Sequence, residues 1–213
     1  MAYDYKKEMK ALYQPKAAPE IVTVPKAAFI AVRGAGDPNE EGGSYAAALG
    51  VLYAVAYTLK MSPKTGHIIP GYFEYVVPPL EGFWRTEQPG APDLSDKSAF
   101  QWISVIRLPE FVTQAEFDWA VETASRKKKL DCSAAELLEI EEGLCVQMMH
   151  IGPYDGEPAT VARMTSFAAE QGYLPDFSDT RLHHEIYLSD PRRTAPEKLK
   201  TVIRHPIKVS PTD

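Results

Sequence analysis

The chain has 213 residues, of which 45% are hydrophobic and 24% charged, the balance of an ordinary globular protein. Its net charge of −6 and its pI near 5.5 give a surface that repels phosphate backbones, so we expect no nucleic-acid partner. Two cysteines are too few for a disulfide framework, and a polar N-terminus with no long apolar run predicts a cytoplasmic protein without membrane contact.

The first half of the chain predicts a strand, a helix and two further strands. About twenty residues rich in Lys, Pro and Ala come first, and we expect them to form a surface arm. The apolar run 27–32 then predicts a buried strand, which ends at the glycines and proline of 34–38. Ser44 can cap a buried helix that extends to about residue 60. Two more strands are predicted over 72–77 and 100–108, separated by a polar loop over 86–97.

A helix is predicted to link this half to the next. Thr113 and Glu116 match a capping box, and apolar residues follow at helical spacing. The basic run 126–129 marks the end of this helix, where cations complement the helix dipole. This explanation accounts for the run without any nucleic-acid contact.

The second half repeats the order of the first. A strand over 144–151 is followed by a turn over 152–156 and by a helix that starts near Pro158 and stops at Gly172. Two strands, over 182–188 and 201–207, complete the repeat. We therefore expect an α+β fold in which two βαββ modules, within about 20–110 and 137–208 of a single domain 1–213, form a joined antiparallel sheet. Their helices are expected on one side of it, with a ligand cleft at the seam. The alignment of the two halves places Glu74 and Glu185 at equivalent positions.

Motifs for metals, nucleotides and covalent catalysis are missing from the sequence. Acidic residues follow Gly34-Ala35-Gly36, and no Gly-Lys-Ser/Thr occurs, so this segment is interpreted as a turn rather than a phosphate loop. His183 and His184 are adjacent on a predicted strand and point to opposite faces, so they cannot form a two-histidine metal pair. We therefore expect no metal and no cofactor.

Aromatic residues gather near carboxylates in both halves. In the second half, Glu185 shares one face of its predicted strand with His183 and Tyr187. Strand glutamates usually face water, and this interpretation is favoured for Glu74 taken alone. Glu185 lies on a strand that should be buried, and an unpaired buried carboxylate is costly, so a functional role is favoured there.

Three segments carry a resemblance to a known family. They are Tyr-Phe-Glu-Tyr-Val-Val-Pro-Pro-Leu-Glu-Gly-Phe-Trp at 72–84, Ile-Gly-Pro-Tyr-Asp-Gly-Glu-Pro at 151–158 and His-His-Glu-Ile-Tyr-Leu-Ser-Asp-Pro-Arg-Arg at 183–193. With the two-part plan, they make residues 16–207 resemble the stand-alone GyrI-like small-molecule-binding proteins. The resemblance implies tandem βαββ modules of the SHS2 type with a ligand cleft between them. It also implies that direct transcription control is not expected, because about twenty residues before the first module are too few for a helix-turn-helix domain.

The resemblance also implies roles for individual residues. Glu185 matches the glutamate that binds cationic, aromatic drugs in relatives, and Trp84 and Tyr154 match aromatic positions of the stand-alone group. The expected catalytic residues are Glu185 and Tyr154, and the expected ligand-binding residues are Trp84, Glu74, Phe73, Tyr187, Phe83 and His183.

Two functions remain open from the sequence. The first is a module that binds small aromatic or hydrophobic compounds, including cationic ones, for protection against drugs or toxins. The second, implied by the stand-alone members that look like cyclopropanoid cyclopropyl hydrolases, is an enzyme that opens the strained cyclopropane of DNA-alkylating compounds with water activated by the cleft glutamate. A purely structural role has little support, since it leaves the aromatic-carboxylate cluster without a purpose. The natural ligand, the oligomeric state and any partner protein are not predicted.

Overall fold

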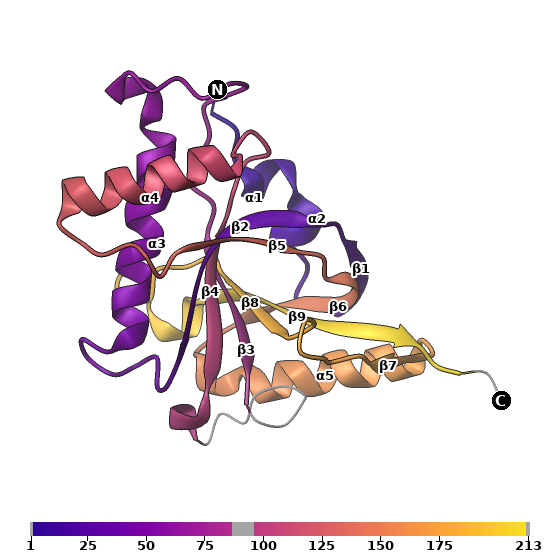
Figure 1. Ribbon diagram of the computed structural model, residues 1–213. Helices are drawn as coiled ribbons and strands as arrows, with labels where there is room; N and C mark the ends of the chain where they lie inside the picture. The colour runs from indigo at the N-terminus through magenta and orange to yellow at the C-terminus, as the bar shows by residue number, and fades with distance from the viewer. Residues whose placement is uncertain (1, 87–95, 212–213) are drawn as a thin grey trace.

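The computed structural model describes residues 2–86 and 96–211 (Figure 1). Its helices are α1 (Tyr5–Glu8), α2 (Lys10–Tyr13), α3 (Ser44–Lys60), α4 (Gln114–Lys128) and α5 (Glu157–Glu170). Its strands are β1 (Glu20–Val24), β2 (Ala27–Ala35), β3 (Leu80–Arg85), β4 (Gln101–Arg107), β5 (Glu136–Ile140), β6 (Gly143–Ile151), β7 (Tyr173–Pro175), β8 (His183–Tyr187) and β9 (Lys200–Val209). Most of the loop predicted over 86–97 lies outside the described residues.

The strands form one antiparallel sheet whose order is symmetric about its centre. The order is β1-β6-β9-β8-β3-β4-β2-β5, with β7 added beside β9. Each half contributes a βαββ unit, β2-α3-β3-β4 and β6-α5-β8-β9, and the two units meet where β3 pairs with β8. The predicted α+β fold of duplicated modules in a joined antiparallel sheet is confirmed.

The edge strands exchange between the two halves. β1 precedes β2 in the chain but pairs with β6, and β5 precedes β6 but pairs with β2. β1 and β2 have the same lengths and the same two-residue connection as β5 and β6. Each half therefore extends the sheet of the other, which ties the modules together by backbone hydrogen bonds. β1, β5 and β7 were not predicted from the sequence, because they are short and only partly buried.

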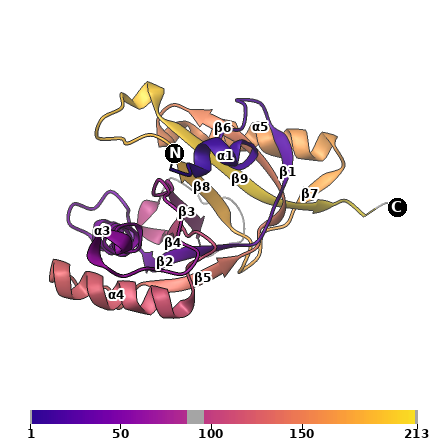
Figure 2. The same cartoon turned by 90° about the horizontal axis from the view of Figure 1, so that it is seen from above.

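The long helices frame the sheet on one face. α3 packs on β2 and β4 with α4 against it, while α5 packs on β6, β7 and β9 at the other end of the sheet (Figures 1 and 2). Thr113 caps α4 as predicted, and the basic residues 126–128 form its last turn. None of the helices in the described part of the chain is long and apolar enough to span a bilayer.

The N-terminal segment differs from the predicted surface arm. α1 and α2 lie on the face of the sheet opposite the long helices, where Tyr5, Leu12 and Tyr13 are buried in a cluster with Ile186. The Tyr13 hydroxyl donates to Glu81, at 2.9 Å. Lys, Pro and Ala dominate the composition of this segment, but its few large apolar residues fix it to the sheet.

The predicted strand over 72–77 is wrong. In this segment only Tyr75 forms an isolated bridge, to Tyr3, and the strand begins after Pro78 and Pro79, at Leu80. The two prolines cannot donate to a ladder, so they set the start of β3 rather than the end of an earlier strand.

The predicted equivalence of Glu74 and Glu185 fails with it. Glu81 pairs with Val105 as His184 pairs with Arg204, so the residue equivalent to Glu185 is Gly82. Gly82 and Glu185 also face each other directly across the central pair of strands.

Candidate functional site

A cleft of about 830 Å³ lies over β3 and β8, at the seam between the two modules. α3 forms one wall with Tyr45 and Tyr53, and the turn before α5 forms the opposite wall with Tyr154. The volume falls in the range of small-molecule sites, which preferentially form where structural units meet. The position agrees with the cleft expected from the duplication.

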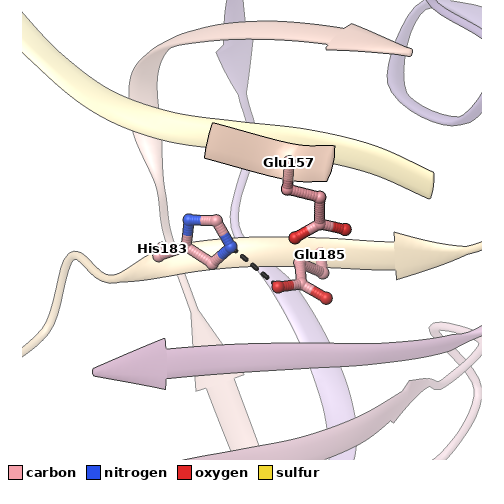
Figure 3. A group of neighbouring side chains, drawn as sticks. All are labelled: Glu157, His183 and Glu185. Atoms are coloured by element: carbon pink, nitrogen blue, oxygen red, sulfur yellow. Dashed lines mark hydrogen bonds and ion pairs between the residues drawn. The ribbon is translucent and has the colours of Figure 1, made fainter. Parts of the chain in front are cut away.

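Two carboxylates lie side by side on the floor of the cleft (Figure 3). Glu185 comes from β8 and is 7% exposed, and Glu157 is the first residue of α5 and is 3% exposed. Burial, and then the charge of Glu185, raise the pKa of Glu157 well above its ordinary value. Two adjacent buried carboxylates cannot both ionise without compensation, so the pair holds one proton, and Glu157 carries it.

A histidine supports Glu185 from the same strand. Because alternate residues of a strand share a face, His183 and Glu185 lie side by side, and His183 Nε2 is 2.8 Å from Glu185 Oε1 (Figure 3). His183 Nδ1 is in turn 2.7 Å from Nε2 of His205 on β9. Among the described residues, Glu157, His183 and Glu185 are the one group whose ligand atoms, all within 4.8 Å of one another, could hold a cation.

Aromatic side chains enclose the carboxylates. The Trp84 indole N–H donates to the Tyr187 hydroxyl at 2.9 Å, and the ring of Tyr154 stands edge-on to that of Tyr187, with 6.0 Å between centroids. Burial, and then the charge of Glu185, raise the pKa of Tyr154 to about 12, so its hydroxyl remains a proton donor at neutral pH. Such walls suit flat, apolar ligands, and the phenols add hydrogen-bond donors.

Gly82 makes the contact between the tryptophan and the tyrosine possible. A Cβ atom at this position would lie 2.6 Å from the Trp84 indole nitrogen and 3.1 Å from the Tyr187 oxygen. Both rings therefore close over the bare backbone of β3, directly beside Glu185.

Two ion pairs lie at the rim of the cleft. Lys97 reaches Asp155 at 3.0 Å, and Arg192 holds Asp190 through two contacts of 3.0 Å. These pairs largely neutralise one another, so the charge of Glu185 dominates the deep part of the cleft.

The residues expected in the site divide into two groups. Glu185, Tyr154, Trp84 and Tyr187 line the cleft, and His183 contacts Glu185 directly behind them.

The other three lie elsewhere. Phe83 points to the opposite face and stacks on His184 at 4.0 Å, because it alternates with Gly82 and Trp84 along β3. Phe73 packs against Phe111, and Glu74 is exposed outside any strand.

Two features of the site were missed in the sequence. Glu157 stands in the Gly-Glu-Pro segment that was singled out, but only its proline was interpreted there. Tyr45, Tyr53 and Tyr57 follow one another along α3 at multiples of four residues. The helix predicted here was a buried one, but Tyr53 and Tyr57 are 38% and 51% exposed. An exposed aromatic stripe facing the seam was the available signal.

The fold and the cleft define a small-molecule-binding domain built from two fused modules. The family model of the GyrI-like small molecule binding domain matches residues 17–208, and the chain belongs to this family.

Solved structures agree with this assignment. An uncharacterized conserved protein from Listeria innocua is 48% identical, with a TM-score of 0.90 over 97% of this chain and 100% of that one. A hydrolase from Listeria innocua is 45% identical, with a TM-score of 0.88 over the same shares. The C-terminal domain of EcmrR, at 11% identity and a TM-score of 0.52 over 90% of this chain and 97% of that one, shares the fold alone. No curated protein matches the sequence significantly.

Proposed function

We propose that the protein is a hydrolase that binds a small aromatic compound in the cleft and adds water to an activated carbon of it, opening a strained cyclopropane ring. The observation that carries the proposal is the carboxylate pair on the cleft floor. Glu185 is available as a base, and Glu157 beside it retains its proton. A carboxyl group whose pKa is raised, beside a second carboxylate, is a usual pattern of a general acid and a general base.

The reaction balances with these groups. Glu185 takes a proton from water as the water oxygen bonds to the ring methylene carbon, and the carbon–carbon bond of the cyclopropane breaks. The electron pair of that bond moves through the conjugated system to a carbonyl oxygen, which becomes a phenolate oxygen. Glu157 returns a proton there, and the Tyr154 hydroxyl donates a hydrogen bond to the developing charge. The net change is the addition of one water.

The similarity to the hydrolase from Listeria innocua supports this proposal, since it extends over 97% of the chain. The test is incubation of the protein with a cyclopropane-containing DNA alkylator, followed by mass spectrometry. We expect the product to gain the mass of one water at a rate proportional to enzyme concentration. Unchanged compound after many equivalents of protein would refute the hydrolase.

A second candidate is protective binding without turnover. The aromatic walls and the single dominant carboxylate favour cationic, aromatic ligands, because a desolvated cation–π contact contributes about 2 kcal/mol. Tight binding of such a dye with no chemical change in any cyclopropanoid compound would select this candidate.

A further inference from the structure

The pair of buried imidazoles behind the cleft has no role in the chemistry proposed above. His183 is 2% exposed and His205 is 4% exposed, so neither ring exchanges hydrogen bonds freely with solvent. The chain of contacts runs from His205 Nε2 to His183 Nδ1 at 2.7 Å, and from His183 Nε2 to Glu185 Oε1 at 2.8 Å. Two imidazoles therefore connect in line to the carboxylate assigned as base.

The chemistry of these contacts fixes where the protons lie. An ionised carboxylate can only accept, so His183 Nε2 must carry the hydrogen in its contact with Glu185. A neutral imidazole with a hydrogen on Nε2 has a bare Nδ1, which must then accept from His205 Nε2. Burial lowers the pKa of His205 well below its ordinary value, so this ring is neutral. The neutral pair consequently has one arrangement, with both N–H bonds directed toward Glu185.

Glu157 receives no comparable support. Its Oε1 atom is buried and has no hydrogen-bond partner among the described residues. Glu185 Oε1 therefore accepts from a histidine, whereas Glu157 Oε1 has no donor. A hydrogen bond from a donor stabilises the ionised form of the group that accepts it, so this difference separates the roles of the two carboxyl groups.

We propose that His205 and His183 form a positioning pair that orients the Glu185 carboxylate, with the N–H bonds of both rings directed toward it. His205 donates to Nδ1 of His183 and so keeps the hydrogen of that ring on Nε2, and His183 Nε2–H orients the Glu185 carboxylate. The proposal rests on the proposed function for its consequences in turnover, but the proton positions themselves are a property of the free protein. The titratable groups that face the pair are Glu185 and, beyond it, Glu157, with the Tyr187 hydroxyl against Glu185.

The direct test is long-range ¹H–¹⁵N NMR of the histidine rings in the ligand-free protein at neutral pH. We expect both His183 and His205 to be protonated at Nε2 and bare at Nδ1. A bare Nε2 on either ring, or a His183 protonated at both nitrogens, overturns the proposal. This outcome does not depend on any ligand, so it is separable from a failure of the proposed hydrolysis.

Substitutions at His205 supply the second arm of the test. His205→Gln retains an N–H donor, whereas His205→Leu removes it with similar bulk. We expect the Leu variant to lose roughly tenfold or more in kcat with little change in KM, which is part of the 10²–10⁴ that a general base contributes. The Gln variant should regain most of the lost kcat.

Phe177→Leu is the matched control, because Phe177 packs on the His205 ring, with 5.0 Å between centroids, and carries no exchangeable proton. Equal losses in kcat for His205→Gln, His205→Leu and Phe177→Leu would mean that His205 acts by packing alone, and would overturn the proposal. Absence of turnover in the unsubstituted protein would refute the hydrolase, while the NMR result would still decide the role of the pair.

Discussion

Replacement of Glu185 by Gln separates the chemical role of the cleft carboxylate from its structural one. The amide keeps the shape and can still accept from His183, but it has neither the charge nor the basicity. A general base contributes 10²–10⁴ to the rate, so we expect kcat to fall at least a hundredfold, equivalent to about 3 kcal/mol of activation free energy. The free energy of unfolding should change by no more than about 1 kcal/mol, since no cavity forms and no donor is orphaned.

Ligand affinity responds through the same charge. A cation about 4 Å from a carboxylate gains about 4 kcal/mol at an effective dielectric constant of about 20, and partial loss of its hydration offsets part of this gain. A net loss of about 1.4 kcal/mol already weakens binding tenfold. We therefore expect Glu185→Gln to weaken a cationic aromatic dye at least tenfold, measured by fluorescence titration, and to weaken a neutral ligand much less.

Glu74→Gln is the matched control, because Glu74 is exposed and lies outside the cleft. It should leave turnover and dye affinity unchanged. If Glu185→Gln leaves both quantities intact in a folded protein, the reasoning from the carboxylate pair is wrong. A loss of activity in Glu74→Gln would point to a site elsewhere on the molecule.

Three further predictions concern the surroundings of this carboxylate. Trp84→Ala should lower the affinity for a planar dye at least tenfold. Because Trp84 is 4% exposed, it should also lower the free energy of unfolding by about 3–5 kcal/mol, and unchanged stability in urea would contradict the packing described. Gly82→Ala should weaken ligand binding, because its Cβ would displace the Trp84 indole. Gly50→Ala, whose nearest contact would be 4.0 Å away, should stabilise α3 by about 0.5–1 kcal/mol in thermal unfolding. An equal gain in thermal stability from Gly82→Ala would refute the close approach at Gly82. Because the pKa of Glu157 is raised in the folded protein, its contribution to stability is full below the unfolded value of about 4.3 and is lost as pH rises through the folded value. Glu157→Gln should therefore flatten this decline in urea titrations at successive pH values, and an unaltered slope would show that folding does not raise the pKa of Glu157.

The sequence predicted the module order well because that order rests on local signals. The apolar run of β2, the capping Thr113 and the glycine-proline turn after β6 each act within a few residues, and each is found where expected. The start of β3 was misjudged, since Tyr72–Val77 has strand composition but is stopped from pairing by the prolines that follow. The exchange of β1 and β5 between halves was not predictable, because local pattern carries no information about which distant strand supplies the hydrogen bonds.

The candidate site was predicted only as far as strand alternation reaches. Alternation along β8 placed His183, Glu185 and Tyr187 together, and the structure agrees. Glu157 and His205 were missed because they come from α5 and β9, and only the fold brings Glu157 to Glu185 and His205 to His183. The same limit explains the false symmetry with Glu74, which depended on an alignment of strands that pairing does not support.

The two modules differ in the residue that each places at the centre of the sheet. At the centre of the sheet, equivalent positions of the two modules hold Gly82 and Glu185, which face each other across the β3–β8 pair. Two glutamates there would place like charges directly opposite at the seam, and two glycines would leave no charged group. The observed combination gives Glu185 room, because the absence of a side chain at Gly82 lets Trp84 and Tyr187 close beside it. Because one module has a glycine here and the other a carboxylate that accepts from His183, the seam has a single chemically distinct side. A ligand bound in this cleft is therefore expected to have one preferred orientation, with its reactive or cationic group directed toward the second module.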